Sequence, residues 1–280
     1  MQLGIFGLSA KAVHGPVETA RLAVRAEELG YHSWWVGEHV VLPSPRVPPS
    51  PMEPTDAILD PLVHLAYVAA ITRRMQLGTG IVILPQRNPL VLAKQVASLD
   101  VLSGGRLVLG VGAGYLEPEM TAVGVPMSER GSRTDEYLDA MRALWTEPRP
   151  SYRGRHASFG GVDARPRPVR PDGPPIVVGG HSPAALRRAV QRGHGWYGFS
   201  LSPEAVASHL EGLRQAAGEV ERPVRLGRLE ILVTPPNPVG PDEARRYAEL
   251  GVDTLLLHPL PIEDPAQVSA FLERHADLLQ

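Results

Sequence analysis

The sequence predicts an α/β protein, a (β/α)8 or TIM barrel that forms a single domain over residues 1–280. Short apolar segments alternate with helical segments along the whole chain, and eight such strand–helix units can be counted. No linker, internal repeat or low-complexity tract interrupts them. Apolar strands that alternate with helices indicate a parallel sheet, and eight units allow that sheet to close on itself. An open doubly wound sheet is the alternative.

The first four strands are predicted from apolar runs, and the helices between them from their end signals. The strands are expected at residues 3–6, 33–37, 75–83 and 106–112, and the first three helices at 17–30, 60–72 and 88–105. Gly30 is a typical helix C-cap, while Asp60 followed by Pro61 is a typical helix start. Trp34 and Trp35, in the second strand, are expected to pack between the barrel and its helices.

The second half of the chain continues the alternation. Strands are expected at 175–180, 195–200, 224–233 and 252–260, and helices at 133–145, 182–193, 203–219, 242–250 and 265–279. Two insertions exceed a minimal barrel: the proline-rich stretch 42–58 after the second strand, and the stretch 146–174 after the fourth strand and its helix, which could include a short hairpin. Long loops in compact domains are usually functional or disordered.

Composition narrows the classes of function. The net charge of −2 gives no global field that favours nucleic acid or an anionic membrane. The absence of cysteine excludes disulfides, thiolate catalysis and cysteine-bound metals, and the histidines show no metal-ligand spacing. No apolar run approaches a membrane span, and the first residues lack the features of a signal peptide. We therefore expect a cytoplasmic protein, and no metal site is predicted.

A glutamate and a histidine follow the second strand directly. In a TIM barrel, side chains at the carboxyl ends of strands face the active site, which is where Glu38 and His39 are expected. Histidine can give or take a proton near neutral pH, and an adjacent carboxylate can orient it or keep it charged. We interpret the two residues as a catalytic pair. A surface pair in a loop is the alternative.

Glycine-rich turns follow three other strands. Gly80 ends the third strand, and "GVGAGYLEPE" (110–119) follows the fourth. In "VVGGHSPAALRRA" (177–189) a strand leads into a helix whose expected N-cap is Ser182. Bare backbone N–H groups in such turns and at helix N-termini bind phosphates and other anions. The alternatives are a bend at the barrel edge, a turn without a ligand and an ordinary capped helix.

Three segments, in this order, resemble the bacterial luciferase-like family of flavin and deazaflavin enzymes. They are "AEELGYHSWWVGEH" (26–39), "LGTGIVILPQRNPLVLAKQVASLDVLSGGRLVLGVGAGY" (77–115) and "PPIVVGGHSPAALRRA" (174–189). The stretch "LSGGRLVLGVGAGY" and the short chain are most similar to the coenzyme F-420-dependent oxidoreductases. The resemblance covers almost the whole chain, and the fold that it implies is the TIM barrel expected above.

The resemblance also implies a cofactor site. The family often has a non-proline cis peptide behind the cofactor ring, which would here be Gly80–Ile81. The pair Glu38–His39 would line the ring, with His39 implicated in catalysis. The cofactor phosphate would lie between the loops after strands four and five, which here are Gly112, Ala113, Gly114 and Tyr115, and Gly179, Gly180, His181 and Ser182.

The activity that the resemblance implies is hydride transfer between the deazaflavin coenzyme F-420 and a small organic substrate, with His39 handling the coupled proton. An FMN-dependent luciferase-like monooxygenase is the alternative, and a non-catalytic flavin- or deazaflavin-binding protein is a further one. Several flavin members carry a phosphate-binding arginine where this chain has Ala113, which favours the deazaflavin. A homodimer is the family expectation.

Overall fold

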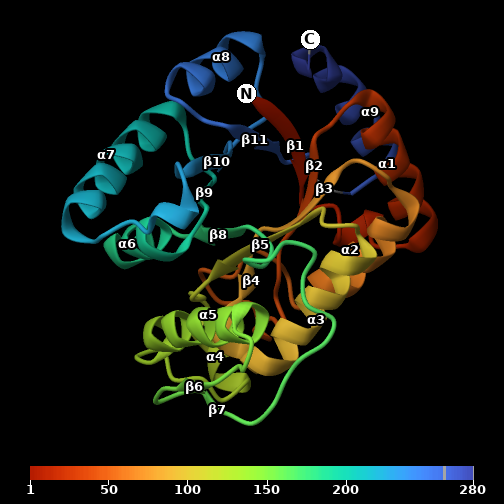
Figure 1. The fold of residues 1–280 in the computed structure, drawn as a ribbon. Helices are drawn as coiled ribbons and strands as arrows, with labels where there is room; N and C mark the ends of the chain where they lie inside the picture. The colour runs from red at the N-terminus through yellow and green to blue at the C-terminus, as the bar shows by residue number, and fades with distance from the viewer. Residues whose placement is uncertain (261–262, 280) are drawn as a thin grey trace.

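The computed structural model describes residues 1–260 and 263–279, in which parallel strands form a closed barrel (Figure 1). The barrel strands are β1 (Gln2–Phe6), β2 (Ser33–Val36), β3 (Gln76–Thr79), β4 (Val82–Ile83), β5 (Leu107–Gly112), β8 (Ile176–Gly179), β9 (Gly195–Phe199), β10 (Glu230–Thr234) and β11 (Thr254–Leu257). Their order is β3-β2-β1-β11-β10-β9-β8-β5-β4, and β3 also pairs with β5, which closes the ring. The predicted (β/α)8 barrel is confirmed, and an open sheet is excluded.

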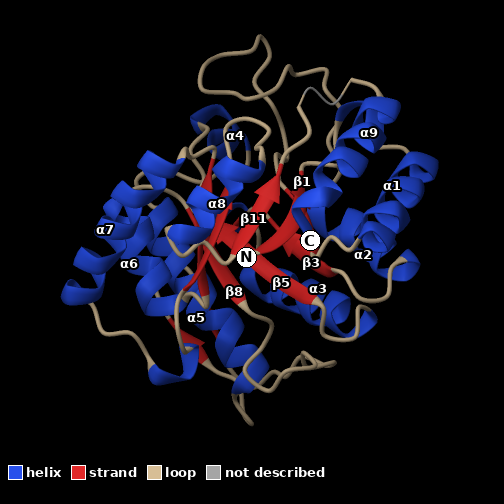
Figure 2. Cartoon of the chain, turned by 90° about the horizontal axis from the view of Figure 1, so that it is seen from above, coloured by secondary structure: helices blue, strands red, loops and turns tan. Residues whose placement is uncertain are grey.

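Helices form an outer layer around these strands (Figure 2). They are α1 (Pro16–Leu29), α2 (Pro61–Ile71), α3 (Pro89–Leu102), α4 (Glu117–Ala122), α5 (Arg130–Thr146), α6 (Pro183–Arg192), α7 (Pro203–Glu219), α8 (Pro241–Glu249) and α9 (Pro265–His275). The predicted caps are confirmed. Gly30 ends α1 with a φ of +96°, and the Asp60 carboxylate accepts hydrogen bonds from the Leu62 and Val63 amides at the start of α2. Within the described part of the chain, no helix has the length and apolar character needed to cross a membrane.

Three elements differ from the prediction. The strand expected at 75–83 is two strands, β3 and β4, separated by the Gly80–Ile81 peptide, which is cis as the resemblance implies. The strand expected at 224–233 begins only at Glu230, because residues 224–226 form a 3-10 turn that ends at Gly227 with a φ of +58°. Extended strand backbone has negative φ, so Gly227 interrupts the apolar run. The short helix α4 was not predicted.

Both insertions form ordered loops. The segment 146–174 contains the antiparallel hairpin of β6 (Tyr152–Arg153) and β7 (Ser158–Phe159), which confirms the hairpin considered for it. The segment 42–58 is tied to the loop after β1, where Ala57 accepts a hydrogen bond from the Lys11 amide at 2.9 Å. The predicted domain, 1–280, includes residues 261–262 and 280, which lie outside the described residues.

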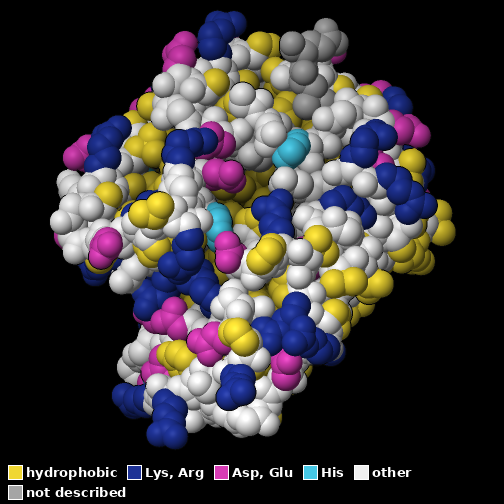
Figure 3. Space-filling model, viewed as in Figure 1, with side chains coloured by type: hydrophobic (Ala, Val, Ile, Leu, Met, Phe, Trp, Pro, Cys, Tyr) yellow, Lys and Arg dark blue, Asp and Glu magenta, His cyan; other side chains and the backbone are white. Residues whose placement is uncertain are grey.

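The core has two layers because successive strand residues point to opposite faces of the sheet. Trp34 points outward into the layer between barrel and helices, where its Nε1 donates to Nε2 of the buried His64 at 3.1 Å. Trp35 points inward and packs in the barrel with Phe6 and Tyr197. The expectation that both tryptophans pack outside the barrel is therefore correct only for Trp34. On the outer surface, acidic and basic side chains are mixed over the face shown in Figure 3.

Candidate active site

The predicted cofactor loops lie side by side at the end of the barrel where the carboxyl ends of the strands converge, which we call the barrel mouth. β5 and β8 are neighbours, with Val111 paired to Val178, so the turns that follow them are adjacent. A Cβ built on Gly112 would lie 3.9 Å from the carbonyl oxygen of Gly179. The structure thus brings together the loops 112–115 and 179–182, which are separated by more than sixty positions in the chain.

Ile81 connects these loops to the segment after β3. Its side chain lies so close to both glycines that a Cβ on Gly112 would be 2.7 Å from Ile81 Cδ1, and one on Gly179 would be 2.8 Å from Ile81 Cγ2. Real Cβ atoms do not approach other atoms so closely, so a side chain at either position would displace the Ile81 side chain. On the other side, a Cβ on Gly80 would contact Phe6 at 3.0 Å. Two of the predicted loops, 112–115 and 179–182, therefore converge on the cis segment.

The two glycine-rich loops present unused backbone donors. Within the described residues, no hydrogen bond is recorded from the amide groups of Ala113, Gly114, Tyr115, His181 and Ser182. Ser182 caps α6, since its Oγ accepts from the Ala185 amide at 3.3 Å. Free amide donors beside a helix N-terminus are the chemistry that a phosphate group requires. The loops therefore fit the phosphate of a flavin or deazaflavin.

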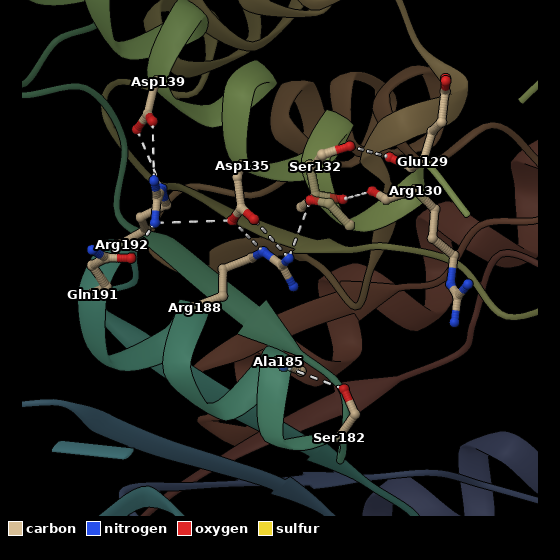
Figure 4. A network of polar contacts seen from close by, with 12 residues as sticks. Glu129, Arg130, Ser132, Asp135, Asp139, Ser182, Ala185, Arg188, Gln191 and Arg192 are labelled. Carbon is tan, nitrogen blue, oxygen red and sulfur yellow. Dashed lines mark hydrogen bonds and ion pairs between the residues drawn. The ribbon is translucent and has the colours of Figure 1, made fainter. Parts of the chain in front are cut away.

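α6 is held in place by ion pairs with α5 (Figure 4). The Arg188 guanidinium is buried and donates to Asp135 Oδ1 at 2.7 Å and to the Gly131 carbonyl at 3.2 Å. One turn further along, Arg192 donates to Asp139 Oδ2 at 3.2 Å. These contacts fix the orientation of α6 and, with it, the position of Ser182 at its first turn.

His181 has a structural contact as well as its predicted place in the phosphate loop. Its Nε2 accepts a hydrogen bond from the Phe199 amide at 3.3 Å, and its ring stacks on His209 with centroids 4.9 Å apart. Burial and the neighbouring His209 lower the pKa of His181 below its usual range. A neutral ring is consistent with an Nε2 that accepts a hydrogen bond.

His39 is paired with Glu119, a residue that sequence reasoning missed. His39 Nδ1 lies 2.9 Å from Glu119 Oε2, and Glu119 Oε1 accepts the Val40 amide at 2.6 Å. The Glu119 side chain is completely buried, whereas that of His39 is 9% exposed. The only sequence signal for Glu119 is its position in "GVGAGYLEPE" after the fourth strand, where it follows the glycine-rich turn by five residues.

The recorded partners of Glu38 are not the His39 ring but the last residue of β4 and the segment that follows it. Its Oε2 accepts the Ile83 amide at 2.6 Å, and its Oε1 accepts from Arg87 Nε at 2.8 Å. Burial raises the pKa of Glu38, while the Arg87 guanidinium and the Ile83 amide act in the opposite direction. The Arg87 guanidinium also bonds to Asp60. With both oxygens in use, Glu38 has the contacts of an anchor, and a catalytic role for it stays a prediction.

An aromatic wall completes the barrel mouth, and its residues were also missed. Phe6 and Phe199 end β1 and β9, and their ring centroids lie 5.3 Å apart. His258 follows β11 and packs edge-on against Phe6 at 5.0 Å. Burial lowers the pKa of His258 to about 4. This part of the mouth is therefore aromatic, and the ring of His258 is neutral near pH 7. In residues 1–260 and 263–279, no group of acidic residues and histidines has the arrangement of a metal site.

The fold and the mouth together define a TIM barrel whose glycine-rich loops fit a phosphate-bearing ligand beside a histidine–carboxylate pair. The luciferase-like monooxygenase family matches residues 1–276, and the chain belongs to that family. Enzymes of this family are oxidoreductases or monooxygenases.

Individual relatives include both kinds of enzyme. An uncharacterised protein of Mycobacterium tuberculosis is 34% identical over 271 residues, which is 93% of this chain and 92% of the relative. The F420-dependent glucose-6-phosphate dehydrogenase of Kineococcus radiotolerans is 32% identical over 226 residues, 75% of this chain and 63% of that enzyme. Among solved structures, monooxygenase RslO1 of Streptomyces bottropensis superposes with a TM-score of 0.81 and 27% identity, covering 100% of this chain and 98% of that one.

Proposed function

We propose that the protein is an oxidoreductase that transfers a hydride between coenzyme F-420 and a small organic substrate. The observation that carries this proposal is His39, held by a buried carboxylate at the barrel mouth next to the predicted cofactor loops. Interconversion of an alcohol and a carbonyl moves a proton together with the hydride, and His39 is the mouth residue suited to that proton. The F-420-dependent relative supports the same assignment.

Each group of residues at the mouth has a different role in the proposed reaction. The amides of loops 112–115 and 179–182 would hold the cofactor phosphate, and the Gly80–Ile81 segment would lie behind the ring. When bound, the deazaflavin accepts or supplies the hydride. His39 takes the proton from a substrate hydroxyl or returns it to a carbonyl. The aromatic wall of Phe6, Phe199 and His258 excludes water from the substrate.

An FMN-dependent monooxygenase is the second candidate, and the 27% identity to monooxygenase RslO1 favours it. Against it, Ala113 occupies the position where several flavin members have a phosphate-binding arginine. The two candidates separate on cofactor binding. We expect purified protein to quench the fluorescence of F-420 at micromolar concentration and to bind FMN more weakly. Tight binding of FMN without binding of F-420 would contradict the proposal.

A third candidate is a carrier that binds the cofactor without turnover. His39→Ala separates it from an oxidoreductase. For an oxidoreductase, we expect this variant to bind F-420 as the parent protein does and to lose most of its turnover with a panel of alcohols and aldehydes. A parent protein that binds F-420 and turns over no member of the panel supports the carrier.

We further propose that the protein is a homodimer, and a cytoplasmic location stays a prediction. The outer faces of α2 and α3, which pack side by side, expose Val63, Tyr67 and Val91, at 70%, 41% and 57%. Adjacent exposed apolar side chains are typical of subunit interfaces. We expect light scattering to give twice the chain mass, and Val63→Asp with Val91→Asp to give the monomer. Val224→Asp, at a position that is 97% exposed, is the control and should remain dimeric.

A further inference from the structure

We propose that Glu119 is the positioning residue of His39, fixing which ring nitrogen carries the proton and which faces the substrate. The inference rests on the proposed function in giving His39 a proton to move. Glu119 lies on α4, outside the Glu38–His39 pair and outside the loops 112–115 and 179–182.

The geometry leaves Glu119 with two contacts. Its Oε1 accepts the Val40 amide at 2.6 Å, and its Oε2 lies 2.9 Å from His39 Nδ1. A backbone amide can only donate, so Oε1 is an acceptor. An ionised carboxylate accepts at both oxygens, which makes Nδ1 the protonated nitrogen of His39.

The surroundings of Glu119 prevent water from replacing its two hydrogen-bond partners. The side chain is fully buried, and the next residue, Met120, packs with Ile83 and Val125 in an apolar cluster. Water does not reach the carboxylate there, and a buried charge without a partner is costly. Glu119 therefore retains His39 as its partner, and the ring is held at one nitrogen.

The other nitrogen is then the reactive one. Within the described residues, no hydrogen bond is recorded for His39 Nε2. With Nδ1 protonated and bound, the neutral ring presents an unprotonated Nε2, which can accept a proton from a substrate hydroxyl. The charged ring presents the same atom as the donor for the reverse reaction. Carboxylates that bind the far nitrogen of a catalytic or metal-bound histidine set its tautomer in this way.

α4 also links the His39–Glu119 pair to the cofactor loop 112–115. Gly112 to Tyr115 run directly into α4, and the Tyr115 ring lies edge-on to the His39 ring at 6.0 Å. The loop packs tightly on the helix, since a Cβ on Gly114 would lie 2.8 Å from Ile83 Cγ2 and 3.0 Å from Met120 Sδ. One continuous segment therefore supplies the phosphate donors and orients the proton-handling residue.

The test is the tautomer of His39, read from ring ¹⁵N chemical shifts of the protein without cofactor at alkaline pH. Signals of His39 are identified by their absence in His39→Gln. We expect the parent protein to show Nδ1 protonated and Nε2 bare. In Glu119→Gln the single amide oxygen accepts the Val40 amide, so its NH2 group faces Nδ1 and the tautomer reverses. Glu117→Gln, an exposed position on the same helix, is the control and should match the parent.

Two results overturn the inference. One is a parent spectrum with Nε2 protonated, and the other is a folded Glu119→Gln variant whose His39 signals are unchanged. The first result comes from the parent protein alone, so the inference can still be tested if Glu119→Gln does not fold. Because the spectrum requires no cofactor, it is independent of whether F-420 or FMN binds. Where F-420 turnover is measurable, we expect Glu119→Gln to lower kcat about 10- to 100-fold with F-420 affinity unchanged.

Discussion

Glu38 and His39 are neighbours in the chain, but their side chains bind different segments of the barrel mouth. Glu38 binds the Ile83 amide at the end of β4 and Arg87 after it, whereas His39 binds Glu119 on α4. Glu38 therefore links the end of β2 to β4 and the segment after it, and His39 links the end of β2 to α4, which follows β5. At the scale of single residues, these partners make Glu38 an anchor and leave His39 as the candidate for proton transfer. The chemistry of an acid beside a base does not by itself separate the two roles.

The first prediction concerns the anchoring ion pair. We expect Glu38→Gln to lower the free energy of unfolding by about 3 kcal/mol, because it leaves the largely buried Arg87 guanidinium without one of its charged partners. Urea unfolding measures the change. Glu53→Gln, which breaks the exposed pair with Arg46, is the control and should cost less than about 1 kcal/mol. Equal effects of the two substitutions would show that Glu38 is not an anchor.

At the scale of elements, glycines in the barrel strands lie in close contact with the strand beside them. Gly78 in β3 lies under the Trp35 ring of β2, and a Cβ there would be 2.1 Å from Trp35 Cδ2. Gly110 in β5 is similarly restricted, with a Cβ position 1.8 Å from the Thr79 carbonyl oxygen. The Trp35 ring therefore occupies the space inside the barrel that Gly78, its partner in the next strand, leaves free.

The second prediction compares two glycines. Gly78→Ala should destabilise the protein by about 1 to 3 kcal/mol, since the added methyl group overlaps the Trp35 ring. Gly218→Ala, in α7 with no atom within 4 Å of the added Cβ, should instead stabilise it by about 0.5 to 1 kcal/mol. Thermal unfolding of the two variants measures both signs. A neutral Gly78→Ala would mean that Trp35 can move aside.

The elements also show what the sequence could predict. Most strands and caps follow from local patterns, and the rule that parallel strands end at one mouth places Glu38 and His39 there. The pairing of the two loops around a cofactor phosphate was implied by the family resemblance. Glu119 could not be found in this way, because its contact with His39 joins residues 80 positions apart. That contact exists only once α4 forms, and α4 is too short to leave a periodic pattern. The aromatic wall was missed for a similar reason, as β1, β9 and β11 meet only in the closed ring.

At the scale of the whole molecule, several histidines are buried or partly buried without a charged partner. Burial lowers the pKa of His64 to about 4, and burial followed by four nearby arginines lowers that of His194 to about 4. His258 at the mouth behaves likewise. Each remains neutral in the folded protein at a pH where the unfolded chain binds a proton. The free energy of unfolding therefore depends on pH through these histidines.

The third prediction gives the sign of that coupling. The folded pKa of His64, about 4, lies below the ordinary value of 6.5, so its stabilising contribution is complete above pH 6.5 and is lost as the pH falls to 4. We expect urea unfolding to show a decline over this range that His64→Gln reduces by about 3 kcal/mol. Gln retains an acceptor for Trp34. His14→Gln, at an exposed position, should follow the parent curve, and an unchanged slope in His64→Gln would contradict the prediction.

The contact between Glu119 and the Val40 amide has a consequence for how this barrel can diversify. It clamps the backbone immediately after His39, where the 42–58 insertion begins. We therefore expect changes of length or sequence in that insertion to leave the position of His39 unchanged. Under the proposed function, we expect sequence changes in this loop to alter substrate preference while the contact that orients His39 is kept.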